Sequence, residues 1–172
     1  MSENLPQLVM RIDDISFAKK PVIKDGFSVV THSETKEKVW EEIIFDAFNT
    51  HYDFSFAKVF KGFKNEHLFY IKKGEEYIAT IGATHKGGEE KDGWFHMVGV
   101  KKSARGLGVG KMLGEIALYS LKEQGYKSAM LTTDDFRIPA IKLYLSLGFK
   151  PIFTHESHSE RWAKIYEILQ IK

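Results

Sequence analysis

The chain contains no cysteine, and this absence excludes several kinds of protein chemistry. Without thiols it cannot form a disulfide framework, use a thiol nucleophile or build a cysteine-based zinc site. The histidines are scattered, and the close pair His155 and His158 has no cysteine or paired carboxylate beside it to complete a set of metal ligands. We therefore expect no metal site.

Long hydrophobic runs and a large net charge are also missing. No window approaches the ~20 apolar residues that span a bilayer, and the start of the chain lacks the basic flank and apolar stretch of a secretory signal. Lys+Arg 25 against Asp+Glu 23 leave a formal charge of +2, which gives no global field for capturing nucleic acid or an anionic membrane. The sequence predicts a soluble, cytoplasmic protein that binds neither.

The chain is long enough for one domain with a proper core. Its 172 residues are 43% hydrophobic and 13% aromatic, a composition that argues against disorder. Pro6, Pro21 and a polar start set the first residues apart from the rest. The sequence thus predicts an N-terminal lead-in over 1–25 and a single domain over 26–172.

Hydrophobic periodicity predicts a fold in which strands and helices are mixed. Apolar or alternating runs predict strands at 26–30, 67–73, 75–85, 93–101, 126–133 and 149–153. Apolar residues three and four apart predict helices at 36–48, 111–125, 139–148 and from 157 onward, with an aromatic-rich helical or irregular segment at 54–63. Short turns favour an antiparallel meander of three strands, and the helix after it favours a parallel crossover. We expect an α/β sandwich of about six strands in a mixed, mostly antiparallel sheet flanked by helices.

The segment Ala104–Lys111 carries the clearest chemical signal. It follows a predicted strand, precedes a predicted helix and has glycine at every second position from 106 to 110. Glycines let the backbone turn sharply and approach a ligand closely, and the amides of the turn form a phosphate cradle with the positive end of the helix. Arg105 and Lys111 would add positive charge on either side. A plain tight turn needs neither the three spaced glycines nor these cations.

Two well-known phosphate loops do not fit this segment. A P-loop needs glycine where Arg105 stands and serine or threonine where Met112 stands, and a dinucleotide fingerprint needs glycine where Lys111 stands. The pattern Arg/Gln-x-x-Gly-x-Gly/Ala does fit, at Arg105, Gly108 and Gly110. A nucleotide-binding protein built around the same loop is a rival interpretation.

With this loop the chain resembles the GCN5-related N-acetyltransferase (GNAT) superfamily. The stretch FHMVGVKKSARGLGVGKML is similar to the family's fourth strand, loop and third helix, and LTTDDFRIPAIKLYLSLGF is similar to its second signature. The likeness covers roughly residues 26–153. It implies a GNAT-like three-layer sandwich, acetyl-coenzyme A as co-substrate and an amine as acceptor.

The resemblance also implies a role for each matching residue. The pyrophosphate of acetyl-coenzyme A would lie on Arg105, Gly106, Leu107, Gly108, Val109, Gly110 and Lys111. The backbone of Val98, Gly99 and Val100 would pair with the pantetheine arm as an added strand. Tyr144 corresponds to the tyrosine that faces the coenzyme sulfur, where its hydroxyl can protonate or hydrogen-bond the leaving thiolate. The competing interpretation of Tyr144 is a core residue on an amphipathic helix.

Two further positions have open alternatives. Family members often place a base on the fourth strand, where this chain has His96, on the same face as Val98 and Val100 by strand alternation. A water chain with no dedicated base would serve equally. The family's second signature commonly has Asn where this chain has Arg137, which could contact a coenzyme phosphate or pair with a neighbouring aspartate. Pro139 and the two aspartates, Asp134 and Asp135, are interpreted as residues that start the next helix.

The acceptor is the part of the reaction on which the sequence is least informative. The region 40–60 is aromatic and carries Glu41, Glu42, Asp46 and Asp53, which would suit a cationic amine or form the wet face of a helix. A small amine and a peptide N-terminus both stay open. We expect a monomeric or homodimeric N-acetyltransferase that works by direct attack in a ternary complex, since no cysteine can carry an acyl group. A non-catalytic coenzyme A-binding sensor or partner module of the same fold is the alternative.

Overall fold

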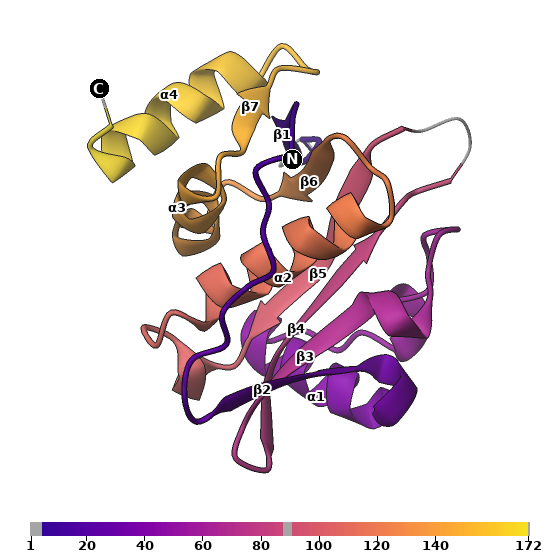
Figure 1. Cartoon of the computed structure of the whole chain (residues 1–172). Helices are drawn as coiled ribbons and strands as arrows, with labels where there is room; N and C mark the ends of the chain where they lie inside the picture. Colours follow the sequence, from indigo (N-terminus) through magenta and orange to yellow (C-terminus); the bar gives the residue numbers. More distant parts are fainter. Residues whose placement is uncertain (1–4, 88–90, 172) are drawn as a thin grey trace.

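The computed structural model describes residues 5–87 and 91–171, and its strands form one sheet with helices on both faces (Figure 1). The strands are β1 (Leu8–Ile12), β2 (Phe27–Thr31), β3 (Leu68–Lys73), β4 (Glu76–Thr84), β5 (Gly93–Val100), β6 (Ala129–Thr133) and β7 (Lys150–Ile152). The helices are α1 (Glu37–Phe48), α2 (Val109–Glu123), α3 (Ile138–Ser146) and α4 (His158–Leu169). The strand order is β2-β3-β4-β5-β6-β1-β7, and every pair is antiparallel except β5 and β6. The predicted mixed α/β sandwich and its antiparallel meander are confirmed.

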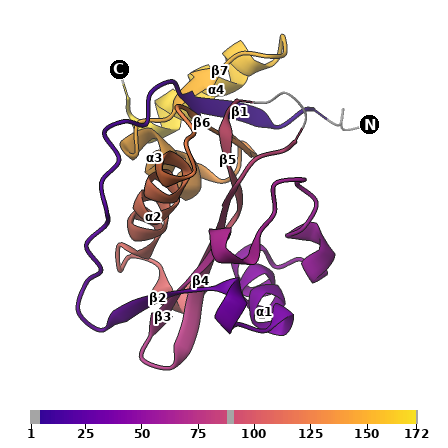
Figure 2. The same ribbon diagram turned by 45° about the vertical axis from the view of Figure 1, so that its right-hand side comes forward.

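Helices α1 and α2 cover opposite faces of the central strands (Figure 2). Helix α1 buries Trp40, Ile43 and Ile44 in a cluster with β3 and the 3₁₀ turn η2 (Phe54–Phe56). Helix α2 buries its own apolar stripe in the main core, which the sheet, α3 and α4 share. Strand β4 lies between the two layers, and it is buried on both sides from Ile78 to Thr84. The apolar pattern of each element therefore agrees with the face or faces that it buries. Among the described residues no helix is both long and apolar enough to cross a membrane.

The parallel crossover leaves the sheet open in its middle. The connection from β5 through α2 to β6 brings the two strands side by side, as predicted. They pair only at Gly93 with Ala129 and at Trp94 with Met130. Within the described parts of the chain, the remainder of β5 has its strand partners on β4 alone. The two strands therefore separate toward the carboxyl end of β5, where the loop into α2 begins.

The N-terminal segment differs from the prediction, because the lead-in predicted over residues 1–25 contains a strand of the same sheet. Strand β1 lies between β6 and β7, and its Leu8 and Met10 are fully buried. The chain then runs along the outside of α2 to β2 (Figure 2). Lys122 of α2 holds this segment by donating to the carbonyls of Ser16 and Ala18 at 2.8 and 2.7 Å. A five-residue strand shows little periodicity, and its partners lie more than 100 residues away, so local pattern does not reveal it.

If β1 is integral to the sheet, Met10→Ala lowers the free energy of unfolding by about 2–5 kcal/mol, the cost of emptying a fully buried methionine site. Urea unfolding followed by circular dichroism measures this loss. The control is Val22→Ala in the same segment, whose side chain is 86% exposed and whose truncation changes stability by no more than about 0.5 kcal/mol. Equal stability of the two variants would contradict the buried strand.

Candidate active site

A cavity of about 1510 Å³ opens where β5 and β6 separate. Its walls come from the end of α1, the segment that follows it, β5, the loop before α2, β6 and α3. The sequence-predicted residues that line it are His96, Val98, Val100, Arg105, Gly106, Gly108, Val109, Gly110, Lys111, Arg137 and Tyr144. Gly99 and Leu107 do not line it: a side chain on Gly99 would meet Ile44 of α1 at 2.9 Å, and Leu107 is 39% exposed. One cavity therefore brings together residues predicted from two separate motifs.

The glycine loop at the start of α2 depends on its glycines for backbone conformation. Gly106 and Gly108 have φ of 78° and 79°, which is a left-handed conformation that other residues adopt at a cost of about 1–2 kcal/mol. Gly108 is the N-cap residue, so the first amides of α2 have no partner within the helix. Gly110 lies against α3, because a Cβ there would be 3.0 Å from Leu143. The helix therefore begins at the cavity with donors available for an anion.

Positive side chains surround this loop in different ways. Arg105 donates from Nη2 to the carbonyl of Ala47 at 3.1 Å, which ties the loop to the end of α1. Lys111 is largely exposed and pairs loosely with Glu115 on α2. Sequence reasoning missed Lys24, whose Nζ lies 3.5 Å from the carbonyl of Leu107. No sequence signal marks Lys24, because it lies 83 residues before the loop in the segment outside α2.

Strand β5 carries a β-bulge beside the cavity. Between the pairs Thr80–Gly99 and Gly82–His96, one residue of β4 faces two residues of β5. Met97 lies in this bulge with φ of 51°, an uncommon value for a residue with a side chain. Bulges bend and twist the strand that carries them. This one lies where β5 leaves β6, so it presents the edge of β5 to the cavity.

Tyr144 lines the cavity from α3 and is only 6% exposed. Its ring packs edge-on against Phe149, with centroids 6.1 Å apart. Burial raises the pKa of the phenol to about 12, and the positive charge of Arg137 opposes that rise. The hydroxyl therefore keeps its proton throughout the neutral range.

His96 is held by the segment that follows α1. Its Nε2 lies 2.8 Å from the carbonyl oxygen of Phe56, and its ring stacks on Phe60 at 4.1 Å. Because a carbonyl only accepts, Nε2 is the nitrogen that carries a proton, and Nδ1 of the neutral ring has the free lone pair. Burial lowers the pKa of His96 below 6.5, while the bond to Phe56 raises it and the charge of Lys86 lowers it further. The imidazole is therefore neutral at pH 7.

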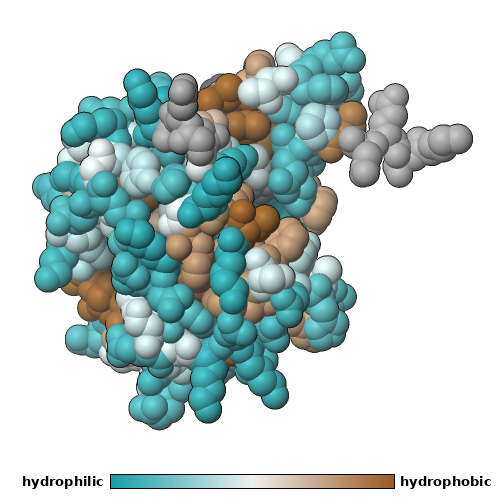
Figure 3. Space-filling view, turned by 90° about the vertical axis from the view of Figure 1, so that its right-hand side faces the viewer, coloured by the Kyte–Doolittle hydropathy of each residue, from teal (hydrophilic) through white to brown (hydrophobic). Residues whose placement is uncertain are grey.

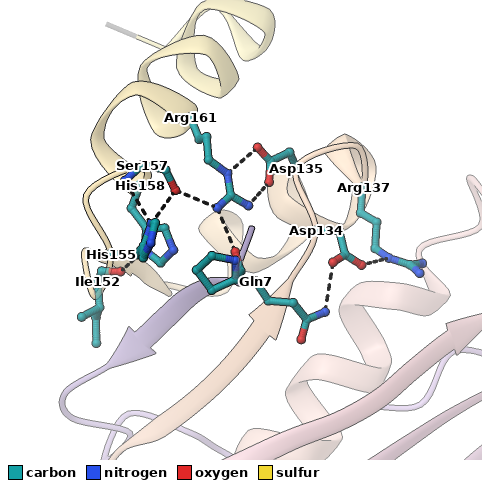
Figure 4. Close-up of polar contacts among 10 residues, drawn as sticks. Gln7, Asp134, Asp135, Arg137, Ile152, His155, Ser157, His158 and Arg161 are labelled. Carbon is teal, nitrogen blue, oxygen red and sulfur yellow. Dashed lines mark hydrogen bonds and ion pairs between the residues drawn. The ribbon is translucent and has the colours of Figure 1, made fainter. Parts of the chain in front are cut away.

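Arg137 is fixed on two sides at the start of α3. Its Nε donates to Asp134 at 3.1 Å, and its guanidinium carbon lies 4.2 Å from the ring centroid of Phe48 on α1. The other oxygen of Asp134 accepts from Gln7 at 3.1 Å (Figure 4). The pairing of Arg137 with a neighbouring aspartate, one of its two predicted alternatives, is therefore present.

The prediction that the two aspartates start α3 is wrong. No side chain caps this helix, whose N-cap is Arg137. Asp135 instead accepts from Arg161 of α4, with its Oδ2 2.8 Å from Nε, and Arg161 also donates to the carbonyl of Pro6 at 2.8 Å (Figure 4). The aspartates therefore join the N-terminal segment, α3 and α4. Pro139 does lie in the first turn, as predicted.

The acidic residues of region 40–60 do not line the cavity. Glu41 accepts from the amide of Phe54 at 3.0 Å, Asp46 accepts from Lys102, and Asp53 accepts from Ser55. The wall on this side carries four aromatic residues, Phe48, Tyr52, Phe56 and Phe60. On the face that lies to the right in Figure 1, patches of hydrophobic surface lie among hydrophilic groups (Figure 3). Among the described residues, Asp134 is the one carboxylate that lines the cavity.

Known acetyltransferases are similar to this chain in sequence or in fold. The mycothiol acetyltransferase of Thermomonospora curvata is 46% identical over 57 residues, which are 33% of this chain and 19% of that protein. A GCN5-related N-acetyltransferase from Sphaerobacter thermophilus has a TM-score of 0.69 at 20% identity, over 86% of this chain and 50% of that one. The NatC complex bound to Gag peptide and CoA includes a chain with a TM-score of 0.64 at 19% identity, over 74% of this chain and 86% of that one. At such identities the structural likeness shows the fold alone.

The family itself follows from a direct match of sequence. This chain spans less than half the length of the first curated relatives that it matches. The model of the Acetyltransferase (GNAT) family matches residues 36–149, which are more than half of the chain and include the glycine loop, β5, β6 and α3. The chain belongs to the GNAT acetyltransferase family.

Proposed function

We propose that the chain is an N-acetyltransferase that moves an acetyl group from acetyl-coenzyme A to a primary amine by direct attack in a ternary complex. The observation that carries this proposal is the shared cavity: the glycine loop at the start of α2, the free edge of β5 and Tyr144 all line it. A phosphate site, a strand edge and a proton-bearing hydroxyl are what a linear phosphorylated thioester needs from its enzyme. Family membership supports the same assignment.

The cavity offers sites that suit the pyrophosphate, the pantetheine arm and the thioester of acetyl-coenzyme A. The amides around Gly106, Gly108 and Gly110 suit the pyrophosphate, since a helix N-terminus favours negative charge. Arg105 and Lys111 add positive charge on either side of them, and Lys24 lies beside the same loop. The edge of β5 from Val98 to Val100 suits the pantetheine arm, whose amides would pair with the strand. The thioester end then lies toward Tyr144.

The reaction needs a neutral amine and a stabilised leaving group. The amine nitrogen attacks the thioester carbonyl carbon, the carbon–sulfur bond breaks, and the amine loses one proton while the sulfur takes up negative charge. The hydroxyl of Tyr144 acts on the departing sulfur. Because an ordinary thiol has a pKa of about 8.5 and burial raises that of Tyr144 to about 12, the phenol is the weaker acid. Its hydroxyl therefore stabilises the thiolate mainly by a hydrogen bond.

His96 is our candidate for the group that accepts the amine proton. Its low pKa keeps the imidazole neutral, and the bond from Nε2 to Phe56 leaves Nδ1 as the basic nitrogen. The same bond gives the residue a structural role, because it holds the aromatic segment against β5. The alternative is a water chain with no dedicated base, and a pH profile distinguishes it from a histidine base.

The phosphate role of the glycine loop is tested by a matched pair of variants. Gly106→Ala and Gly125→Ala both place a side chain at positive φ, 78° and 93°, with open space around it. Both therefore lose similar stability, but only Gly106 lines the cavity. Calorimetry with acetyl-coenzyme A gives a Kd that is about tenfold or more weaker for Gly106→Ala, because the added methyl group occupies space beside the amides and strains the backbone that aims them, at a cost comparable to one charge-assisted hydrogen bond.

Gly125→Ala, at the far end of α2, leaves that Kd at the wild-type value. Stabilisation of the wild-type protein by ATP and not by acetyl-coenzyme A would favour a nucleotide-binding protein instead. Binding of acetyl-coenzyme A without thiol release for any amine would favour the non-catalytic sensor.

Tyr144→Phe removes one hydroxyl and keeps the ring. We expect turnover to fall about 10²-fold, because the leaving thiolate loses its hydrogen bond, while the Kd for coenzyme A stays nearly the same. Thiol release under saturating acceptor measures turnover. Tyr166→Phe on α4, whose ring packs on Trp162, is the control and keeps full turnover. Wild-type turnover in Tyr144→Phe would remove this hydroxyl from the mechanism.

His96→Ala tests the base through the pH dependence of kcat/KM. A protonated imidazole cannot accept a second proton, so activity falls as the pH drops through the pKa of His96, which burial places below 6.5. We expect this acidic limb to disappear in the variant. The control is His51→Ala, whose ring stacks on Phe45 and does not line the cavity. An acidic limb that stays in place in His96→Ala would assign proton removal to water.

A further inference from the structure

The guanidinium of Arg137 has an unused side that faces a ligand site. Its single ion pair among the described residues runs through Nε to Asp134. Figure 4 shows the two terminal nitrogens directed away from that carboxylate. The ring of Phe48 lies 4.2 Å from the guanidinium carbon and, with Asp134, fixes its plane. A planar fork held in this way is preorganised to bind a carboxylate through two parallel hydrogen bonds.

Arg137 lies on the same side of α3 as Tyr144, the residue proposed to act on the thioester sulfur. It is the N-cap of α3, and Tyr144 follows seven residues later, which is two turns along the same side of the helix. Both residues line the cavity, and the charge of Arg137 acts on the Tyr144 phenol. The ring that Arg137 covers belongs to α1, on the aromatic side of the cavity and not on the glycine loop.

This half of the cavity also carries exposed apolar side chains and a second cation. Phe56 is 45% exposed, Val59 59% and Phe136 76%, although all three line the cavity. Large apolar side chains left in water at a concave site gain free energy when an apolar group covers them. Lys86 lies 3.6 Å from the ring centroid of Trp94, so a second cation borders the same aromatic wall. Asp134, the described carboxylate that lines the cavity, is already bonded to Arg137 and Gln7.

We propose that the acceptor is a free α-amino acid with a large apolar side chain, whose carboxylate binds the terminal nitrogens of Arg137. This proposal rests on the proposed acetyl transfer and names its acceptor. The carboxylate on Arg137 places the adjacent amine between the aromatic wall and Tyr144, and the side chain covers Phe56 and Val59. A polyamine would bring further positive charge to a wall that already carries Arg137 and Lys86, and a lysine side chain has no carboxylate of its own to offset its charge there.

The experiment compares two acceptors that differ by one group. L-Phenylalanine carries the carboxylate, and 2-phenylethylamine is the same amine without it. We measure kcat/KM for both with saturating acetyl-coenzyme A. In the wild type the ratio favours phenylalanine about tenfold to a hundredfold, as expected for a hydrogen-bonded charge pair. Arg137→Gln brings the ratio close to one, mostly through the KM for phenylalanine.

Two variants make the result specific to the guanidinium fork. Arg137→Lys keeps the charge but loses the planar pair of donors, so we expect an intermediate ratio. Lys38→Gln removes an exposed cation of α1 that does not line the cavity and keeps the wild-type ratio. Thermal melting of each variant shows whether it is folded. If Arg137→Gln does not fold, the ratio measured for Arg137→Lys tests the proposal in its place.

Four outcomes would overturn the proposal. A wild-type preference for 2-phenylethylamine or spermidine would assign a simple or polycationic amine as acceptor. A weaker Kd for coenzyme A in Arg137→Gln, with both acceptors affected alike, would place Arg137 on the coenzyme. Failure of the wild type to acetylate either amine while it binds acetyl-coenzyme A would reject this acceptor class and leave the coenzyme site in place. Absence of any acetyl-coenzyme A binding would instead reject the proposed transfer itself, and the acceptor with it.

Discussion

The separation of β5 from β6 is the constraint on which the site depends. In the part of the chain that the structure describes, the strands pair at two positions, and the bulge at Met97 then bends β5 away from its parallel neighbour. Backbone donors and acceptors on a separated strand need other partners, because burying them unpaired is costly. The gap is therefore stable only where water or a ligand can enter. The start of α2, the inner side of α3 and the end of α1 are arranged around this gap, so one irregularity of the sheet creates the whole cavity.

The half of the site nearest the glycine loop could be predicted from sequence because its demands are local. Gly106 and Gly108 stand where the backbone turns left-handed, and a helix begins at the next residue. Tyr144 is likewise placed by the spacing of one short helix. Such features need no knowledge of distant residues. This is why the loop could be predicted from its own residues, whereas the roles of β5 and Tyr144 were predicted from the family resemblance; all three line the same cavity.

The remainder rests on contacts between distant parts of the chain, which a linear pattern does not record. Strand β1 pairs with β6 and β7 across more than 100 residues. The bond from His96 to Phe56 spans 40 residues, and the bond from Arg105 to Ala47 spans 58. A lone histidine on a strand carries the same sequence signal whether it is free or hydrogen-bonded. Fold class was therefore predictable, whereas the N-terminal strand and the fixed partners of these side chains were not.

The acidic residues near α1 show how such contacts decide chemistry. In the sequence, Glu41, Asp46 and Asp53 could attract a cationic amine. In the structure each accepts from a backbone amide, so its charge stabilises a loop or turn and none of them lines the cavity. The cavity is thereby left with cations at both ends, although the net charge of the chain is only +2. A local field of this sign favours two ligands that both carry negative charge, and it arises from where the carboxylates are bonded, not from how many there are.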